Sequence, residues 1–462
     1  MKFETAIVGG QVVFPGETTV PASIGVRDGR IACIQVGGGD LDADHVIDAT
    51  GAYVTPGVVE SHSHLCIGKG YEDLTTETVA ALRGGVTSIL FFLRHPAPYD
   101  ETFQRTVAEG ERRSPIDFGF HVVLLTEEHL ASVPRYLREY GITSYKFYMT
   151  YRGKDAAMMD FDGKIKTFAG IDDGFMLACM RELARHPETL MMVHAENIEL
   201  IQRLRAELEA AGRQDMAAWQ ASRPALAELE AVRRACLFAT ASGVRLLFFH
   251  LTTHAALEEI HRARQAHPQL FVEVCHPYLA IHDDGRLERI HKMKPPFRPR
   301  DDVEGLWAGV ADGRVNTVAS DHVPRPAAGK FGELWTPATG APGTPHLLPL
   351  LIEEGFHRRR IPLERIFELA SAGPARLYGL YPRKGAMMVG SDADLLVLDV
   401  DAVKTVRADE VGSCAGYSLY EGRPLRGWPR HALCKGRIAI EDGRLHDLAG
   451  WGRYLRRPAT PA

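Results

Sequence analysis

The sequence lacks several features that would place it in a special class of protein. Its seven cysteines form no Cys-x-x-Cys pair, and an odd number cannot all pair within one chain. No stretch approaches the roughly 18 uncharged apolar residues of a membrane helix. The N-terminus has neither the long apolar run nor the cleavage site of a signal peptide. We therefore expect reduced thiols, a cytoplasmic location and no membrane partner.

The chain also lacks an excess of charge of one sign. Its formal net charge is -5 and its isoelectric point is near 6.5, which argues against nucleic acid as the main partner. A hydrophobic content of 45% and a charged content of 24% are ordinary for globular proteins. At 462 residues the chain is long enough for a large core domain and an accessory module. A small molecule is the expected partner.

Short β-like segments stand at both ends of the chain. FETAIVGGQVVF, SIGVRDGRIACIQVG and HVIDATGAYV lie near the N-terminus, and SDADLLVLDV, TVRADEV and HALCKGRIAIEDGRL lie near the C-terminus. The pattern leaves open whether they form separate modules or one shared domain. The closing residues LRRPATPA (455–462) are expected to be frayed.

Between these ends, apolar runs of strand length alternate with helical stretches, which is typical of βα units and a parallel sheet. The expected strands are 53–60, 85–93, 117–125, 142–149, 189–194, 243–250, 270–275 and 315–320. Eight such strands close a barrel. An open doubly wound sheet is the disfavoured alternative, because no glycine-rich phosphate loop follows the first strand.

Residues with metal-binding side chains follow several of these strands. His62 and His64 come just after the first, where alternate side chains face the same way. Chance alone produces such a pair in a chain with 20 histidines, so the bare motif is weak. However, His194, His250 and Asp321 stand at the ends of later strands, on the rim where barrel enzymes place catalytic groups. Together they favour a metal centre.

Lys146 lies within the apolar run SYKFYM, where an unpaired ammonium is costly to bury. One interpretation is a lysine that reaches solvent or forms an ion pair. The other is an amine that has reacted with carbon dioxide to form a carbamate, whose oxygens can bridge two cations. The residues alone leave both open.

These residues belong to an ordered set of motifs that spans nearly the whole chain. The set is TPGVVESHSHL, SYKFYMTY, VHAEN, SRPALAELEA, EVCHPYL, KPPFRP, SDHVP and ASAGPARLYGLYPRKGAMMVGSDADLLVLD. It resembles the cyclic amidohydrolases, namely dihydropyrimidinases, hydantoinases, allantoinases and dihydroorotases. The resemblance implies an α/β fold: a (β/α)8 TIM-type barrel over 55–385, a small β-sandwich domain from both termini, 1–54 with 386–445, and a tail over 446–462.

The resemblance also implies a binuclear metal centre, most simply of zinc, although such ligands also suit manganese, iron, cobalt or nickel. One ion would be held by His62, His64, carbamylated Lys146 and Asp321, and the other by carbamylated Lys146, His194 and His250. Two cations roughly 3.5 to 4 Å apart activate a bridging hydroxide for attack on the amide. Asp321 is the expected general base and acid, and Tyr151 is expected to stabilise the oxyanion.

Some positions depart from the relatives and bear on the substrate. Glu60 replaces an aspartate two residues before the first metal-binding histidine. Cys66 stands where dihydroorotases carry an arginine, which disfavours that activity. His276 and Pro277 are in an unusual order, and Lys294 replaces a serine that contacts the ring imide in hydantoinases.

Candidate substrate contacts follow from the same comparison: Arg94, Lys294, His322 and Gly343. If Arg94 and Lys294 both face the pocket, an anionic substituent is favoured. A salt bridge on the surface is the alternative for Arg94.

The expected function is hydrolysis of a cyclic amide of the hydantoinase or dihydropyrimidinase type. Alternatives are an allantoinase, a hydrolase of an unusual anionic lactam or imide, and a non-catalytic scaffold, which retention of all six ligand positions disfavours. Related enzymes are homotetramers or dimers.

Overall fold

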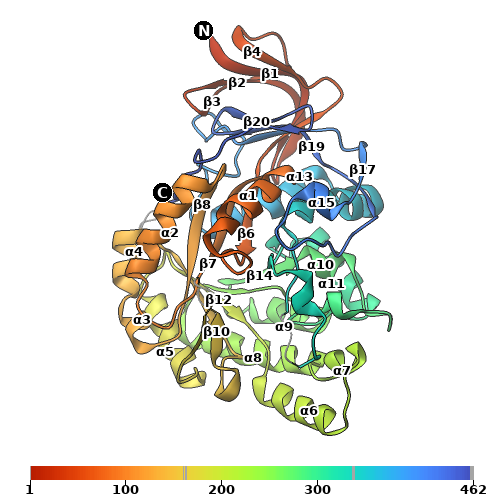
Figure 1. The fold of residues 1–462 in the computed structure, drawn as a ribbon. Helices are drawn as coiled ribbons and strands as arrows, with labels where there is room; N and C mark the ends of the chain where they lie inside the picture. Colours follow the sequence, from red (N-terminus) through yellow and green to blue (C-terminus); the bar gives the residue numbers. More distant parts are fainter. Residues whose placement is uncertain (1, 160, 162–163, 336–338, 458–462) are drawn as a thin grey trace.

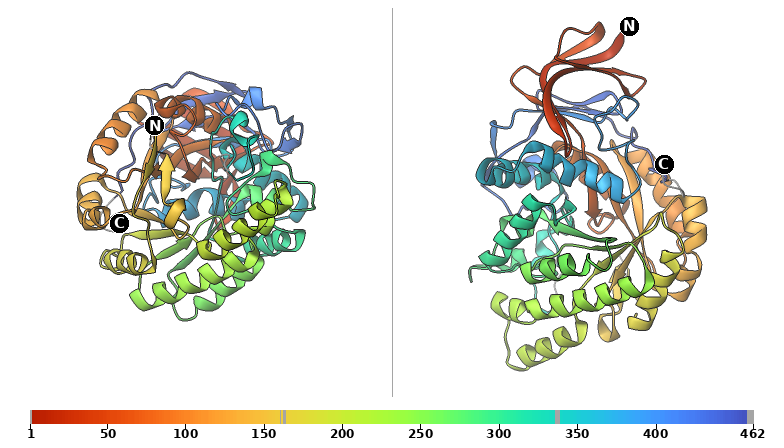
Figure 2. Two further views of the ribbon diagram at one scale, coloured as in Figure 1. Left: turned by 60° about the horizontal axis from the view of Figure 1, so that its bottom comes forward. Right: turned by 180° about the vertical axis from the view of Figure 1, so that it is seen from behind.

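The structure is a computed structural model that describes residues 2–159, 161, 164–335 and 339–457 (Figure 1). A barrel of strands and helices forms the larger body, and a sheet built from both ends of the chain lies against one end of it (Figures 1 and 2). Among these residues, no helix is both long and apolar enough to cross a membrane.

The barrel is a parallel sheet of eight strands that pair in chain order. They are β6 (Val58–Ser63), β7 (Val86–Leu93), β8 (Asp117–Val123), β9 (Ser144–Tyr148), β12 (Leu190–His194), β13 (Leu246–Phe248), β14 (Leu270–Cys275) and β15 (Thr317–Ala319). Backbone hydrogen bonds beyond β15 complete the circle, because His64 N donates to His322 O at 2.7 Å and His322 N donates to His62 O at 3.3 Å. Every residue of β7 and β8 is buried, as expected for parallel strands covered on both faces.

Helices surround these strands as a ring (Figure 2). The longer ones are α1 (Asp73–Arg83), α2 (Asp100–Arg113), α4 (Val133–Tyr140), α5 (Asp173–Ala184), α6 (Ile198–Ala210), α8 (Ala225–Ser242), α9 (His254–Ala263) and α11 (Arg300–Asp312). The shorter ones are α3 (Glu127–Ala131), α7 (Met216–Ala221), α10 (His276–Ala280), α12 (Leu347–Leu350), α13 (Leu363–Phe367), α14 (Gly373–Leu377) and α15 (Ala408–Val411). Their starts are set locally: Asp172 and Asn197 accept hydrogen bonds from the first turns of α5 and α6. Gly243 ends α8 in a left-handed conformation.

The second body is a nine-stranded sheet in which the two chain ends are interleaved. Its strands are β1 (Phe3–Phe14), β2 (Thr18–Arg27), β3 (Arg30–Val36), β4 (Ala43–Asp48), β5 (Tyr53–Pro56), β16 (Leu395–Leu398), β19 (Pro429–Cys434), β20 (Arg437–Glu441) and β21 (Arg444–Leu445). The N-terminal and C-terminal strands join where β5 pairs with β16 in antiparallel register. A separate apolar cluster that includes Ile7, Ile24, Val54 and Leu395 forms its core. The expected fold class is therefore confirmed, whereas the domain boundaries stay a prediction.

The first expected strand, 53–60, is wrong as a single element. Residues 53–56 form β5 of the terminal sheet, and 58–63 form β6 of the barrel. Gly57 lies between them, and a Cβ at this position would stand 2.1 Å from the Thr87 hydroxyl. Pro56 has no backbone N–H to donate to a continuing ladder. The chain therefore changes sheets within an apolar run that shows no break in its pattern.

Two short antiparallel strand pairs, the first of them a hairpin, were not predicted from the sequence. β10 (Ala157–Met159) pairs with β11 (Ile165–Thr167), and β17 (Val403–Thr405) pairs with β18 (Pro424–Arg426). These strands are only three residues long, so they carry too little alternation to be recognised. The hairpin contributes to the cavity described below.

The expected fraying from residue 455 onward is wrong for residues 455–457. Residues 455–457 lie beside β8, where Leu455 N donates to Phe118 O at 2.7 Å. Arg457 is only 1% exposed, and its guanidinium donates to Ser144 Oγ at 2.6 Å and to Phe120 O. The free energy of these contacts outweighs the conformational entropy that is lost when residues 455–457 become ordered. The remaining expected residues of the tail, 458–462, lie outside the described residues.

Candidate metal centre

One half of the candidate site joins the first and last barrel strands. His62 is on β6, His64 follows that strand, and Asp321 follows β15 by two residues. Asp321 Oδ1 lies 3.1 Å from His62 Nε2 and 3.3 Å from His64 Nε2. The ligand atoms of all three residues are within 4.8 Å of one another. Two imidazole nitrogens and one carboxylate oxygen thus converge where a single cation can be held.

The other half lies at the ends of β12 and β13. His194 Nδ1 and His250 Nε2 are 3.0 Å apart, so both nitrogens point to a common position. The ring centroid of His250 is 5.5 Å from that of His62. The two halves are therefore neighbours, as a binuclear centre requires.

Lys146, on β9, lies beside both halves. Its Nζ is 3.9 Å from the ring centroid of Phe249, which is itself 4.2 Å from the ring centroid of His62. The side chain is fully buried, and its amine has no hydrogen-bond partner within the described part of the chain. Burial lowers the pKa of Lys146 to about 7. A neutral amine is therefore accessible here near physiological pH.

The histidines divide into two electrostatic types. Burial lowers the pKa of His64 to about 3 and also lowers the pKa of His194 and of His250, which keeps these imidazoles neutral. Burial opposes the charge of His62 too, but the carboxylates of Asp321 and Glu273 raise its pKa to about 9. A proton on His62 thus balances two carboxylates in this site, and a cation binding there would replace that proton.

These residues fit a pair of divalent cations. Imidazole nitrogens and a carboxylate are typical ligands of zinc and of neighbouring transition metals. The buried amine Nζ of Lys146 has no hydrogen-bond partner in the described structure, whereas His62 Nε2 faces only Asp321 Oδ1 among the candidate ligands, at 3.1 Å. Buried polar atoms rarely lack a hydrogen-bond partner, and a bound ligand or ion is one explanation when they do.

Two buried glutamates that the sequence analysis did not single out orient the imidazoles. Glu273 Oε1 is 2.6 Å from His62 Nδ1, and Glu196 Oε2 is 2.8 Å from His194 Nε2. A carboxylate on one ring nitrogen selects the tautomer that leaves the other nitrogen for a cation. Their positions in the sequence could have identified them. Glu196 follows His194 by two residues, and Glu273 lies within an expected buried strand.

Two of the candidate ligands have a strained backbone conformation. His250 and Asp321 have φ angles of 38° and 49°, in the left-handed region that residues other than glycine seldom adopt. Such conformations cost about 1 to 3 kcal/mol each and tend to occur at functional sites. Here they turn both side chains towards the shared position at the rim.

The candidate ligands line a cavity of about 420 Å³. His64, His194, His250 and Asp321 form part of its wall, and Tyr151 and Met158 form another part. The ring of Tyr151 stacks on Tyr148 with centroids 4.5 Å apart. Burial raises the pKa of Tyr151 to about 12, so its hydroxyl keeps the proton that it would donate to an oxyanion.

Arg94 and Lys294 are both brought to the wall of this cavity. Arg94 is 6% exposed, donates to Leu65 O at 3.2 Å and stacks over Phe161 at 4.9 Å from the ring centroid. It is therefore buried beside the site rather than on the protein surface. Lys294 is exposed at the cavity and lies 5.9 Å from the ring centroid of Trp219.

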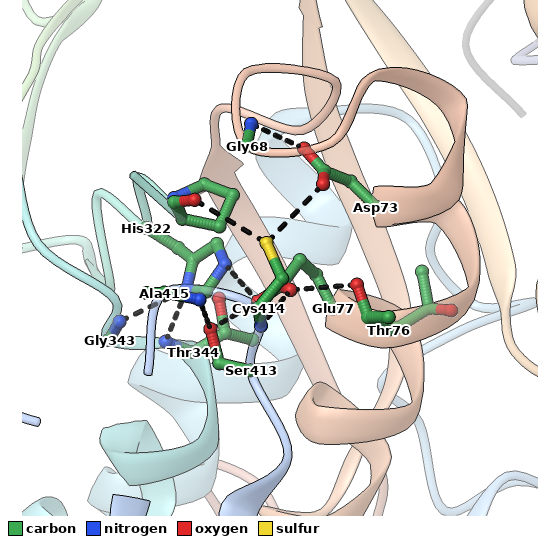
Figure 3. Close-up of polar contacts among 12 residues, drawn as sticks. Gly68, Asp73, Thr76, Glu77, His322, Gly343, Thr344, Ser413, Cys414 and Ala415 are labelled. Atoms are coloured by element: carbon green, nitrogen blue, oxygen red, sulfur yellow. Dashed lines mark hydrogen bonds and ion pairs between the residues drawn. The ribbon is translucent and has the colours of Figure 1, made fainter. Parts of the chain in front are cut away.

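His322 and Gly343 are placed differently, outside the residues that line this cavity. His322 Nδ1 accepts hydrogen bonds from Gly343 N at 3.0 Å and Thr344 N at 3.3 Å, so Nε2 carries the proton that is donated to Glu77 at 3.1 Å. Figure 3 shows this ring between Glu77 and the backbone of residues 343 and 344. Their role as substrate contacts stays a prediction.

A hydrogen-bonded cluster supports the loop behind His64 (Figure 3). Asp73 Oδ2 accepts from Ile67 N and Gly68 N, both at 2.9 Å. Glu77, next along α1, accepts from Ser413 Oγ at 2.6 Å and Cys414 N at 2.8 Å. These carboxylates are satisfied by the protein, which supports a structural role for the cluster.

Comparison with known proteins agrees with this geometry. A model of the amidohydrolase family matches residues 53–439. The L-hydantoinase of Paenarthrobacter aurescens is 31% identical over 451 residues, with 94% of each chain covered, and the allantoinase of Rubrobacter xylanophilus is 33% identical, with 98% of each covered. A crystal structure of a D-hydantoinase superposes with a TM-score of 0.90 at 29% identity, covering 98% of this chain and 99% of that one. Because the family match spans most of its length, the chain belongs to the amidohydrolase family.

Proposed function

We propose that this protein is a metal-dependent hydrolase that opens a cyclic amide by cleaving its C–N bond, in the manner of a hydantoinase or dihydropyrimidinase. The observation that carries the proposal is the convergence of two sets of ligand atoms beside the buried amine of Lys146. The names of the relatives, hydantoinase and allantoinase, support the substrate class. The cavity of about 420 Å³ is of a size that suits a single small heterocycle.

The proposed cofactor is a pair of divalent ions, most simply zinc, shared through a carbamate on Lys146. The residues that would hold them are His62, His64 and Asp321 for one, and His194 and His250 for the other. When bound, such ions lower the pKa of a water molecule and polarise the amide carbonyl. The carbamate is supported by the burial of Lys146 among aromatic rings, by its partner-free Nζ and by its lowered pKa.

Asp321 is the proposed proton carrier. Burial opposes its ionisation, but the charges and hydrogen bonds of His62 and His64 hold its pKa well below the usual range. Its carboxylate is therefore ready to accept a proton from the attacking water. As the water oxygen bonds to the carbonyl carbon, that proton passes through Asp321 to the ring nitrogen, which leaves when the C–N bond breaks. The phenol of Tyr151 donates a hydrogen bond to the oxyanion.

Two other substrate assignments keep the same chemistry. One is an allantoinase, and the other is a hydrolase of an anionic lactam or imide. The position of Lys294 and Arg94 on the cavity wall favours the second. A non-catalytic scaffold is disfavoured, because all six candidate ligand residues are retained, and the short distances among their side chains support this.

The proposed function is tested by metal analysis together with a turnover screen. Zinc-loaded, bicarbonate-treated protein is assayed against hydantoins, dihydropyrimidines, allantoin and cyclic imides, with and without acidic substituents. We expect close to two metal ions per chain and ring opening of at least one class. Asp321→Asn is the matched variant, and it is expected to abolish turnover. Failure of the whole panel by metal-replete protein would contradict the proposal.

We further propose a homotetramer or dimer in the cytoplasm. Free thiols support the location, because all seven cysteines are unpaired with one another. Size-exclusion chromatography with light scattering measures the assembly, and a monomeric mass would contradict it.

A further inference from the structure

The cavity wall beyond the metal-ligating residues is rich in cations. Arg94, Arg223, Lys294 and Arg325 all line it, whereas Asp155 is the one carboxylate among the described lining residues apart from Asp321. Asp155 already accepts a hydrogen bond from Gln202 at 2.8 Å. The cavity wall thus presents more positively charged than negatively charged side chains to a bound ligand.

Arg325 carries the first part of the inference. It follows Asp321 by four residues, on the same loop, and is half-buried. Its Nε is buried without a hydrogen-bond partner in the part of the chain that the structure describes. Burial lowers the pKa of its guanidinium, and the phenols of Tyr151 and Tyr417 raise it. No carboxylate of the described residues pairs with this guanidinium.

Lys294 carries the second part. Its amine is near the face of Trp219, and no ion pair within the described ranges includes it. Arg223 lies over the same indole, 5.1 Å from the centroid, but its guanidinium is bonded to Glu196 at 2.5 Å. Arg223 is therefore paired directly with a carboxylate, whereas Lys294 has no direct ion pair among the described residues, and the more distant charges of Asp155 and Glu196 favour its ammonium.

A partly buried guanidinium without a counter-ion, such as that of Arg325, is costly to the protein unless a ligand supplies the opposite charge. Guanidinium and ammonium groups bind carboxylates through charge-assisted hydrogen bonds. Both groups lie in the cavity that also contains Asp321 and the candidate metal-binding histidines. A ligand whose ring meets those histidines can therefore extend a substituent to the cationic wall.

We propose that the substrate is a cyclic amide that carries a carboxylate side chain, and that Lys294 and Arg325 bind this carboxylate. The inference rests on the proposed function and narrows it to acidic rings. Ring opening is the same hydrolysis as before, with the carboxylate unchanged. The product is then a dicarboxylate, because the new carboxylate from the ring joins the one already present.

The test compares two hydantoins of the same shape and different charge: hydantoin-5-acetic acid and its primary amide. For the wild-type protein, kcat/KM for the acid is expected to exceed that for the amide by about tenfold, as one charge-assisted contact allows. Lys294→Met and Arg325→Met are each expected to reduce this ratio towards one, mainly through KM for the acid. Arg286→Met, which removes a cation from the exposed surface, is the matched control and keeps the wild-type ratio.

Calorimetric binding of the two ring-opened products separates this inference from the proposed function. Tighter binding of the dicarboxylate than of its amide, weakened by added salt and by Lys294→Met, supports the cationic subsite whatever the turnover. If both hydantoins are opened at equal rates and the variants leave the ratio unchanged, the inference is overturned while the proposed function stands. If neither is opened, the proposed function fails for this ring. In that case, equal binding affinities of the two ring-opened products would still overturn the inference.

Discussion

At the scale of single residues, the candidate site depends on groups that hold the ligands as much as on the ligands. Glu273 is fully buried, contacts His62 Nδ1 at 2.6 Å and receives a hydrogen bond from Ser61 Oγ at 3.2 Å. Such a carboxylate raises the basicity of the imidazole and fixes its orientation. It does so without touching the substrate.

Glu273→Gln is expected to weaken metal binding by about 10- to 100-fold, the usual cost of losing a carboxylate that orients a ligand. The amide is nearly isosteric, so the fold should be retained. Competition with a chelating dye measures the affinity. Glu128→Gln, on the outer surface, is the control, and unchanged affinity in the Glu273 variant would show that this contact does not act on the metal.

Lys146→Ala is expected to remove the shared ligand, with loss of bound metal and of ring opening. If the natural ligand is a carbamate, a small carboxylic acid added to the variant fits the vacated space and restores part of both. Metal content by mass spectrometry and turnover in acetate or propionate are the measurements. Two tightly bound ions in the variant without added acid would contradict the bridging role.

At the scale of elements, α1 is tied to the loop after β15 through Glu77 and His322. Burial opposes ionisation of Glu77, but hydrogen bonds from His322, Ser413 and Cys414 lower its pKa to about 2 from 4.5. Because the pKa is lowered on folding, the ionised group stabilises the native state above pH 4.5. This stabilisation is lost as the pH falls towards 2.

Glu77→Gln is therefore expected to cost about 2 to 3 kcal/mol of unfolding free energy at pH 7 and much less near pH 2. Denaturant unfolding of the chelator-treated protein over this pH range measures the difference without interference from metal release. Glu72→Gln, one turn earlier and more exposed, serves as the control. An equal cost at both pH values would show that the charge of Glu77 is not the stabilising feature.

At the scale of the whole molecule, residues 455–457 pack against the barrel beside β8 and β9. Arg457 donates to Ser144 Oγ, which is 2.6 Å from His121 Nδ1, and His121 Nε2 lies 3.0 Å from Ser61 O. A polar layer thus runs through the apolar interior of the barrel. Arg457 supplies the charged donor for Ser144 Oγ and Phe120 O in this layer.

Arg457→Met is expected to destabilise the protein by about 2 to 3 kcal/mol, because Ser144 Oγ and Phe120 O lose a buried, charged donor. The neighbouring Arg456→Met removes a cation from an exposed position and should cost less than about 1 kcal/mol. Denaturant unfolding compares the two. A chain truncated after residue 454 should be at least as unstable as Arg457→Met, and equal stability of all these proteins would show that the tail does not brace the barrel.

The local sequence pattern was sufficient to predict the order of the secondary-structure elements and to identify most of the candidate metal ligands. The alternation of strand and helix periods predicted seven of the eight barrel strands within a few residues and merged the first with β5, because buried strands and amphipathic helices carry short-range signals but the change of sheets does not. His62, His64 and Asp321 were identifiable because strand ends can be read from the same signals, whereas the role of Lys146 came only from the family resemblance. The charge of the pocket was only suggested, through Arg94 and Lys294.

The sequence by itself determined the fold class and the residue types available for chemistry. Only the tertiary structure decided the change of sheets at Gly57, the pairing of Glu273 with His62, the direction of the His322 ring and the burial of Arg457. Each of these is a contact between residues far apart in the chain. Such contacts depend on barrel closure, strand register and burial, and these are properties of the assembled fold that no local periodicity records.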